Sequence, residues 1–136
     1  MRGSRGSTLL EFALAWPVFL LGVFGAVELS IWSVEVMAVR SAALAGARAA
    51  SAAGAGPEAG AGVALTTLRP FLAGATAAAW CPGDLSPRPP VWVCALRLDG
   101  AVEVRVGGEV PSLVPLFGGA GLPVGADVIL SLESFS

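Results

Sequence analysis

The residues that could take part in chemistry gather at the N-terminus of the 136-residue chain. Gly6 ends a short leader that carries Arg2 and Arg5, and Glu11 lies five residues further on. A glycine offers a protease an unhindered, extended backbone at the bond to be cut. A carboxylate at the mouth of an apolar membrane segment is costly unless it meets a partner charge. This spacing predicts a chain that is inserted in a membrane by its N-terminus, is trimmed there, and uses Glu11 to find a partner charge.

The element that must position these residues is a long apolar helix. No charged residue occurs between Phe12 and Val27, and a helix over Leu9–Val27 would span about 28 Å, close to the hydrocarbon thickness of a bilayer. Arginines precede this segment and Glu28 follows it, so the positive-inside rule keeps the N-terminus in the cytoplasm and exports the rest. A cleaved secretory signal is the alternative, although its apolar core would be shorter.

The helix is expected to continue beyond the membrane to about Ala53, where Gly54, Gly56 and Pro57 end it. Pro17 removes one backbone hydrogen bond. It is either a tolerated membrane proline or a point that loosens when the helix packs into a filament. Small residues recur along the helix, and they either reflect an alanine-rich composition or let another helix approach closely. The positions that we assign to helix packing are Gly22, Ala26, Ser30, Ala42 and Gly46.

Four further side chains on this helix also have expected roles or positions. Glu28 and Glu35 share a helix face with Trp32 between them, which indicates a solvated or interfacial face, or else a contact for a partner's arginine. Trp32 falls where an outer interfacial aromatic belt would lie. Arg48 either stabilises the C-terminal end of the helix electrostatically or anchors the exported domain to it.

The remaining residues predict a small exported domain with a short helix and about three antiparallel strands, which makes the chain α+β. Val102, Val104 and Val106 alternate with Glu103 and Arg105, so one face of that strand should be buried and the other wet. The domain is expected to begin with a Gly/Ala/Pro joint (55–62) and a helix from Glu58 to about Leu72 that is disturbed by Pro70. A loop (80–90) then leads to strands at 91–98 and 101–106, which an Asp99-Gly100 hairpin turn joins. A Pro/Gly loop (112–125) with an apolar insert at 113–117 leads to a third strand (127–135).

Cys81 and Cys94 lie on the exported side, where disulfides persist. A bridge between them would close a loop of about 14 residues and add about 3 kcal/mol of stability, and two buried free thiols are the alternative. Their separation fits neither a zinc pair nor a redox pair.

The composition excludes several function classes. Hydrophobic residues make up 55% of the chain and charged residues only 13%, so part of the surface must face lipid or other subunits. The net charge of −2 gives no argument for nucleic acid. With no His and no Lys, the chain lacks the usual activators of Ser or Thr and the usual neutral metal ligand, and Asp99 and Glu103 flank a turn and look solvated. We therefore expect no enzyme, no cofactor, no metal site and no small-molecule substrate.

Two segments resemble the TadE-like family. The string Arg5-Gly6-Ser7-Thr8-Leu9-Leu10-Glu11-Phe12-Ala13-Leu14 is similar to the start of these proteins, and Pro17 fits the proline of their apolar run. Residues 42–50, with Gly46-Ala47-Arg48 at their centre, resemble the Gly-Ala-Arg signature of the family, although Ala45 replaces its usual polar residue. The Val-rich strand, Pro-containing loop and last strand ending in Leu132-Glu133 also look similar.

The resemblance implies a minor pilin or pseudopilin of the tight-adherence (Flp-type) type IV pilus system. A prepilin peptidase would cut between Gly6 and Ser7, and Glu11 would be the Glu at the fifth position of the mature chain. The implied partners are that peptidase, other pilin and pseudopilin subunits, the assembly platform with its secretion ATPase, and the lipid bilayer. The expected organisation is pilin-like, with a leader (1–6), a transmembrane and assembly helix (7–54) and an exported α+β domain (55–136) that lies in the periplasm, at the cell surface or in a pilus.

Cleavage after Gly6 would leave a free amine on Ser7 that is cationic near neutral pH. Glu11 of one subunit could pair with the Ser7 amine of another, which would offset the cost of desolvation and fix the axial register; the alternative is a carboxylate that reaches headgroup water. This hypothesis predicts loss of assembly in Glu11→Ala or Gly6→Leu. The competing hypothesis is an unprocessed single-pass membrane anchor for an exported binding or sensing domain, whose function would be indifferent to Glu11.

Overall fold

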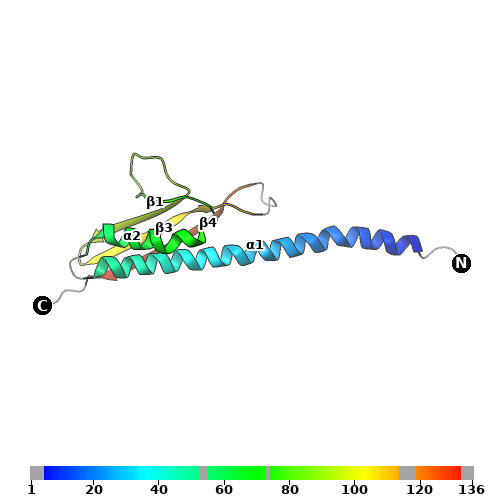
Figure 1. Ribbon diagram of the computed structural model, residues 1–136, viewed down its shortest axis with the longest axis horizontal. Helices are drawn as coiled ribbons and strands as arrows, with labels where there is room; N and C mark the ends of the chain where they lie inside the picture. Colours follow the sequence, from blue (N-terminus) through cyan, green and yellow to red (C-terminus); the bar gives the residue numbers. More distant parts are fainter. Residues whose placement is uncertain (1–4, 53–54, 73, 114–118, 133–136) are drawn as a thin grey trace.

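The computed structural model describes residues 5–52, 55–72, 74–113 and 119–132, and it leaves the side chains of residues 5–8 undescribed. Helix α1 (Arg5–Ser51) runs the length of the molecule (Figure 1). Its first half projects alone, and its second half packs beside α2 (Pro57–Leu68) and beneath a sheet. This arrangement confirms the expected α+β, pilin-like fold class.

Helix α1 remains helical through Pro17 and ends at Ser51. The residues Ala53 and Gly54, where the sequence predicted the end, lie outside the described part of the chain. Helix α2 starts at Pro57, because proline at the first helical position loses no intrahelical hydrogen bond. A 3-10 turn, η1 (Arg69–Phe71), follows α2 and contains Pro70, which confirms that this proline disturbs the helix end.

The described residues form a sheet in the order β1-β2-β3-β4. Strands β2 (Val91–Leu98) and β3 (Ala101–Val110) are antiparallel and are joined by the expected two-residue turn, where Gly100 has a φ of 72°. Strand β4 (Leu122–Ser131) pairs antiparallel with β3. The short strand β1 (Ala77–Ala79) pairs parallel with β2, so the sheet is mixed rather than purely antiparallel.

Two differences from the sequence analysis have physical causes. Strand β1 is a run of three alanines with little strand propensity of its own, and it forms by pairing with β2. Strand β4 begins at Leu122, inside the expected Pro/Gly loop, because it is an edge strand and an edge tolerates Pro123. The expected strand residues after Leu132 and the apolar insert at 114–117 lie outside the described residues.

The core lies between the two helices and one face of the sheet. Strand β3 turns Val102, Val104 and Val106 into this core, as the alternation predicted. The prediction of a wet opposite face is wrong for Glu103, which is buried on the outer face and pairs with Arg105 at 2.7 Å (Nη2 to Oε1). Leu96 of β2 and Ile129 of β4 lie beside Glu103 in the sheet. The alternation of residues along one strand does not reveal such neighbours on other strands.

Helices α1 and α2 touch backbone to backbone at two glycines. A Cβ atom added at Gly46 would lie 2.7 Å from the carbonyl oxygen of Gly60 and 2.9 Å from Cβ of Ala64. A Cβ added at Gly60 would lie 2.7 Å from the carbonyl oxygen of Gly46. Only glycine fits at these two positions without moving a helix.

A disulfide joins Cys81 to Cys94, as predicted, with a Cα–Cα distance of 4.8 Å. The bridge fixes the loop that follows β1 to the middle of β2. The indole N–H of Trp80 donates to the carbonyl of Ser86 (3.0 Å), and the Cys81 N–H donates to Oδ2 of Asp84 (2.8 Å). The disulfide therefore ties the loop to β2, and the two hydrogen bonds fix its internal shape.

We predict that Gly46→Ala lowers the free energy of unfolding by about 1–3 kcal/mol, because the new methyl group overpacks the α1–α2 contact. The matched control is Gly62→Ala in α2, where an added Cβ meets nothing within 4 Å. Both changes gain about 1 kcal/mol of helix propensity, so the control should be neutral or stabilised. Thermal unfolding of the detergent-solubilised protein measures both, and equal stability of the two variants would contradict the close contact.

We predict that replacing both Cys81 and Cys94 by serine lowers the free energy of unfolding by about 3 kcal/mol, because the unfolded chain is no longer constrained. Denaturant titration with and without reductant measures the effect. Reductant should destabilise the natural chain and leave the double variant unchanged. A reductant effect of the same size on both proteins would show that the bridge is not its target.

Candidate assembly site

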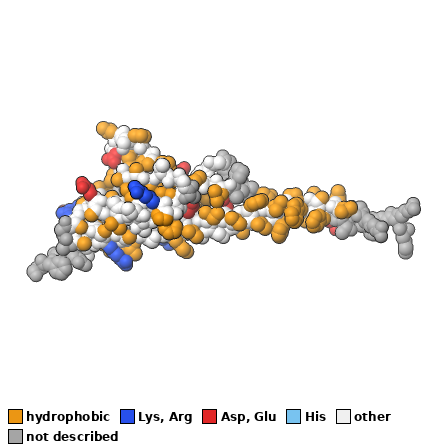
Figure 2. Space-filling model, viewed as in Figure 1, with side chains coloured by type: hydrophobic (Ala, Val, Ile, Leu, Met, Phe, Trp, Pro, Cys, Tyr) orange, Lys and Arg blue, Asp and Glu red, His pale blue; other side chains and the backbone are white. Residues whose placement is uncertain are grey.

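The first half of α1 is an apolar surface that the described part of the chain leaves uncovered. Figure 2 shows hydrophobic side chains covering the projecting helix. It is the one described helix long and apolar enough to cross a membrane, and its composition is consistent with a membrane anchor or a signal. Its exposed large side chains are Leu9, Leu10, Phe12, Leu14, Trp16, Val18, Phe19, Leu21, Val23, Phe24 and Val27.

Three aromatic side chains form a ladder along this surface, which we call the aromatic ladder (Phe12, Trp16 and Phe19). The ring centroids of Phe12 and Trp16 are 6.0 Å apart, and those of Trp16 and Phe19 are also 6.0 Å apart. Together with Ala15 the three rings line an apolar slot of about 320 Å³. The sequence analysis missed this ladder, although its spacings of four and three residues place it on one helix face.

The proposed cleavage bond lies in the first turn of α1. Gly6 and Ser7 are helical here, so a protease that needs an extended backbone at Gly6 would have to open this turn. The first four N–H groups of a helix have no intrahelical acceptor, so opening this turn breaks few hydrogen bonds. Glu11 is exposed one turn beyond Ser7, and helical spacing puts the two positions on the same face.

The small residues assigned to helix packing divide into two groups. Gly22, Ala26 and Ser30 are exposed, and an added Cβ at Gly22 meets nothing within 4 Å. Ala42 and Gly46 are buried inside the domain, and Gly46 contacts a helix of the same chain. Only the first group is therefore open to a helix from outside.

The junction between the projecting helix and the domain contains two buried carboxylates. Glu28 is 4% exposed and Glu35 is 6% exposed, so the expectation of a solvated face is wrong. Oε1 of Glu28 accepts a hydrogen bond from the Leu113 N–H (3.2 Å), and the Trp32 indole donates to the carbonyl of Pro123 (3.1 Å). The face that the sequence predicted to be solvated is the face on which α1 binds the loop after β3 and the start of β4.

Glu35 lies beyond the apolar segment 9–27. Burial raises the pKa of its carboxyl above the usual range, and the neighbouring Glu28 carboxylate raises the pKa further. Glu35 therefore takes up a proton at a higher pH in the folded protein than in the unfolded chain.

The segment Gly46-Ala47-Arg48 has both structural and electrostatic roles. Gly46 and Ala47 are buried, whereas Arg48 is exposed in the last turn of α1. A cation at this end complements the helix dipole, as one of the two sequence interpretations held. A hydrogen bond from Arg97 Nη2 to the carbonyl of Ala55 (3.2 Å) ties the chain after α1 to β2, a role that the sequence analysis did not foresee.

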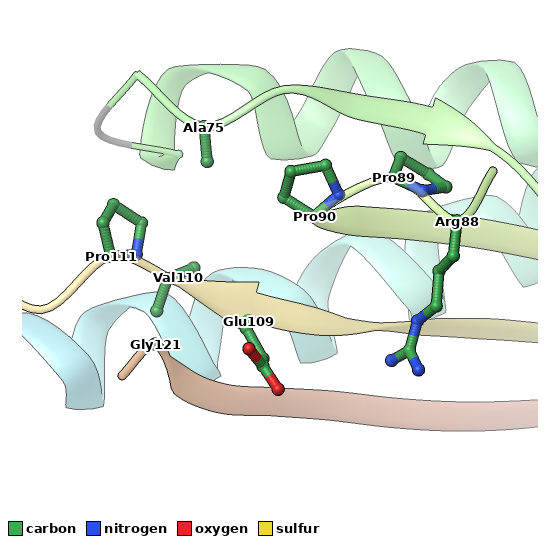
Figure 3. Close-up of a pocket in the computed structure, with 8 residues that line it drawn as sticks. All are labelled: Ala75, Arg88, Pro89, Pro90, Glu109, Val110, Pro111 and Gly121. Atoms are coloured by element: carbon green, nitrogen blue, oxygen red, sulfur yellow. The ribbon is translucent and has the colours of Figure 1, made fainter. Parts of the chain in front are cut away.

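An open hollow of about 630 Å³ lies at the end of the sheet nearest the projecting helix. Figure 3 shows Pro89 and Pro90 before β2 and Pro111 after β3 around it, with the side chains of Arg88 and Glu109 pointing in a common direction. The guanidinium of Arg88 also lies 5.8 Å from the ring centroid of Trp92.

A projecting apolar helix that continues into the core of a small α+β domain defines a pilin-like protein. The sequence model of the family described as TadE-like protein matches residues 6–48. The chain is therefore TadE-like through its N-terminal helix, from the proposed cleavage site to Arg48. Comparisons with curated proteins and with solved structures gave no match. The similarity of this segment to the TadE-like family implies a role in the biogenesis of a tight-adherence pilus, with partners from that system.

We predict that Glu35→Gln raises stability at neutral pH, because it removes a carboxylate that is costly to charge in the folded state. A raised folded-state pKa means that stability falls as the pH rises from the unfolded-state pKa to the folded-state pKa. The natural chain and Glu35→Gln should therefore converge in acid and diverge toward neutral pH. Unfolding measurements across this pH range test the sign of the stability difference, with Glu109→Gln, a change at an exposed carboxylate, as the control. If the natural chain became more stable relative to Glu35→Gln as the pH rises, the prediction would be contradicted.

Proposed function

We propose that this chain is a minor pilin or pseudopilin that takes part in assembly of a tight-adherence pilus by helix packing after its leader is removed. The observation that carries the proposal is the uncovered apolar half of α1, which lies inside the TadE-like segment. A soluble protein would bury such a surface, because each large apolar side chain gains about 1.5–3 kcal/mol on leaving water. Lipid before assembly and neighbouring helices after assembly would both cover it.

The orientation in the membrane follows from charge and redox chemistry. Arg2 and Arg5 precede the apolar segment, which favours a cytoplasmic N-terminus. The Cys81–Cys94 bridge supports an exported domain, because disulfides persist in oxidising compartments. We therefore place the domain in the periplasm, at the cell surface or in the pilus.

Processing would occur between Gly6 and Ser7. A prepilin peptidase would need the first turn of α1 to open, and this turn is the part of the helix with the fewest internal hydrogen bonds. The new Ser7 amine is cationic near neutral pH and would pair with Glu11 of a neighbouring subunit. In a low-dielectric bundle such a pair fixes register, because any axial slip leaves a charge unpaired.

Packing would use two complementary stretches of α1. At 100° per residue the aromatic ladder and the small residues Gly22, Ala26 and Ser30 fall within about 120° of each other around the helix. The two stretches are ten or eleven residues apart. An axial offset of about 15 Å would therefore seat the aromatic rings of one subunit over the small residues of its neighbour.

We expect intact-mass spectrometry of the membrane-fraction protein to give a chain that begins at Ser7. Gly6→Leu should abolish this processing, because a side chain at the cut bond hinders the peptidase. The matched control is Gly3→Leu in the same leader, which should be processed normally.

Retention of the leader in the natural chain, both with and without the prepilin peptidase, would contradict the processed-pilin function. It would favour the alternative, an unprocessed single-pass anchor for an exported binding or sensing domain.

We expect Glu11→Ala to be processed normally but to fail in pilus incorporation, because its register contact is lost. The exposed carboxylate of Glu58 on α2 supplies the control, and Glu58→Ala should be incorporated. Immunoblots of sheared pili and of the membrane fraction measure both. Equal incorporation of the two variants would contradict the charge pair.

A further inference from the structure

The end of the domain nearest the projecting helix is held at a fixed height on α1. Glu28 accepts a hydrogen bond from the Leu113 N–H in the loop after β3, and Trp32 donates to the carbonyl of Pro123 at the start of β4. Glu28 directly follows the charge-free run that ends at Val27. At 1.5 Å per residue these anchors lie about 2–8 Å beyond that run along the helix axis.

This end of the domain exposes several apolar residues beside two charged ones, Arg88 and Glu109. Leu113 is 61% exposed, Leu29 of α1 is 63% exposed, and Pro90 and Pro111 are exposed beside them. The sequence from Pro111 to Pro123 contains no charged residue. We call the described residues Pro90, Pro111 and Leu113 the membrane-facing rim.

The opposite end of the domain also carries exposed charges. Arg97 and Asp99 are exposed at and beside the turn between β2 and β3. That turn lies at the far end of the sheet from Val91 and Val110, because β2 runs away from the rim and β3 runs back toward it. The two ends therefore differ in their position relative to the apolar half of α1, and not in whether they carry charge.

We propose that the membrane-facing rim rests on the outer leaflet of the bilayer, at the depth of the lipid headgroups. This inference rests on the proposed function, because it takes α1 as the membrane anchor. The headgroup region adds about 5–8 Å on each side of the hydrocarbon core, which is the height at which Glu28 and Trp32 hold the rim. Val27 at the end of the apolar run and Leu29 just beyond it are both exposed, so apolar surface on α1 extends to the height of the rim.

The side chains beside the rim fit this environment. Proline and leucine can enter the boundary between headgroups and acyl chains, and Arg88 in the adjacent hollow can reach lipid phosphates along its aliphatic stem. Glu109 lines the same hollow and can remain in headgroup water. The contact would give the domain a fixed orientation over the membrane before the subunit is drawn into a pilus.

The test uses the full-length protein with its disulfide intact, reconstituted in phosphatidylcholine–phosphatidylglycerol vesicles. One cysteine is added at a time and labelled with an environment-sensitive fluorophore, in the variants Leu113→Cys, Leu85→Cys and Val23→Cys. The Leu113 side chain is exposed and only its backbone N–H is bound, so the substitution should fold. Leu85 is the matched control, because it is a fully exposed leucine on the disulfide-linked loop.

We expect the label at position 113 to be quenched by lipids spin-labelled near the glycerol backbone, and severalfold less by aqueous iodide than the label at position 85. Equal iodide quenching at 113 and 85 would overturn the proposal in favour of a solvated rim. Protection from iodide without lipid quenching would overturn it in favour of a protein neighbour. The label at position 23 tests the membrane anchor separately. Quenching at 23 by lipids labelled near the bilayer centre, without lipid quenching at 113, would reject the rim contact alone. The absence of lipid quenching at 23 would reject both the membrane anchor and the rim contact.

Discussion

The structure depends on a single helix, α1, whose two halves have different surroundings. The first half of α1 exposes large apolar side chains, and the second half buries small ones against α2 and the sheet. The change occurs without a break in the helix, so the domain and the apolar segment share one rigid axis. The backbone contact between Gly46 and Gly60 makes this arrangement possible, because it brings α2 close enough for both helices to cover the same face of a small sheet.

The junction on this axis is polar, buried and specific. Glu28 and Trp32 bind backbone groups of the loop after β3 and of the start of β4, while Glu35 is buried nearby with a raised pKa. Such buried polar contacts add little net stability compared with apolar packing, but they allow few alternative arrangements. We infer that these contacts set the angle between the domain and α1 and the position of the domain along the helix axis. A subunit that leaves a bilayer for a filament would then carry its domain in a defined orientation.

Local patterns in the sequence predicted the elements that local chemistry determines. The long apolar run, the Asp99-Gly100 turn, the alternation at Val102 and the Cys81–Cys94 bridge all follow from short-range rules, and the structure confirms them. The failures concern residues whose environment comes from distant parts of the chain. Glu28, Glu35 and Glu103 looked solvated because no local pattern reveals the loops and strands that cover them. The same holds for β1, which is a strand only because β2 lies beside it. Of the candidate site, the sequence analysis named Gly6, Ser7, Glu11 and the small residues, but it overlooked the aromatic ladder, whose helical spacing the sequence already contains.

The central claim is that the uncovered half of α1 becomes an interface with other pilus subunits. The most direct test replaces Phe19 by a photoreactive phenylalanine analogue and irradiates cells that are assembling pili. The account predicts a covalent adduct with another subunit of the pilus system, and its loss in a strain without the prepilin peptidase. Adducts with lipid alone, in cells that assemble pili normally, would contradict the account and leave α1 as a permanent membrane anchor.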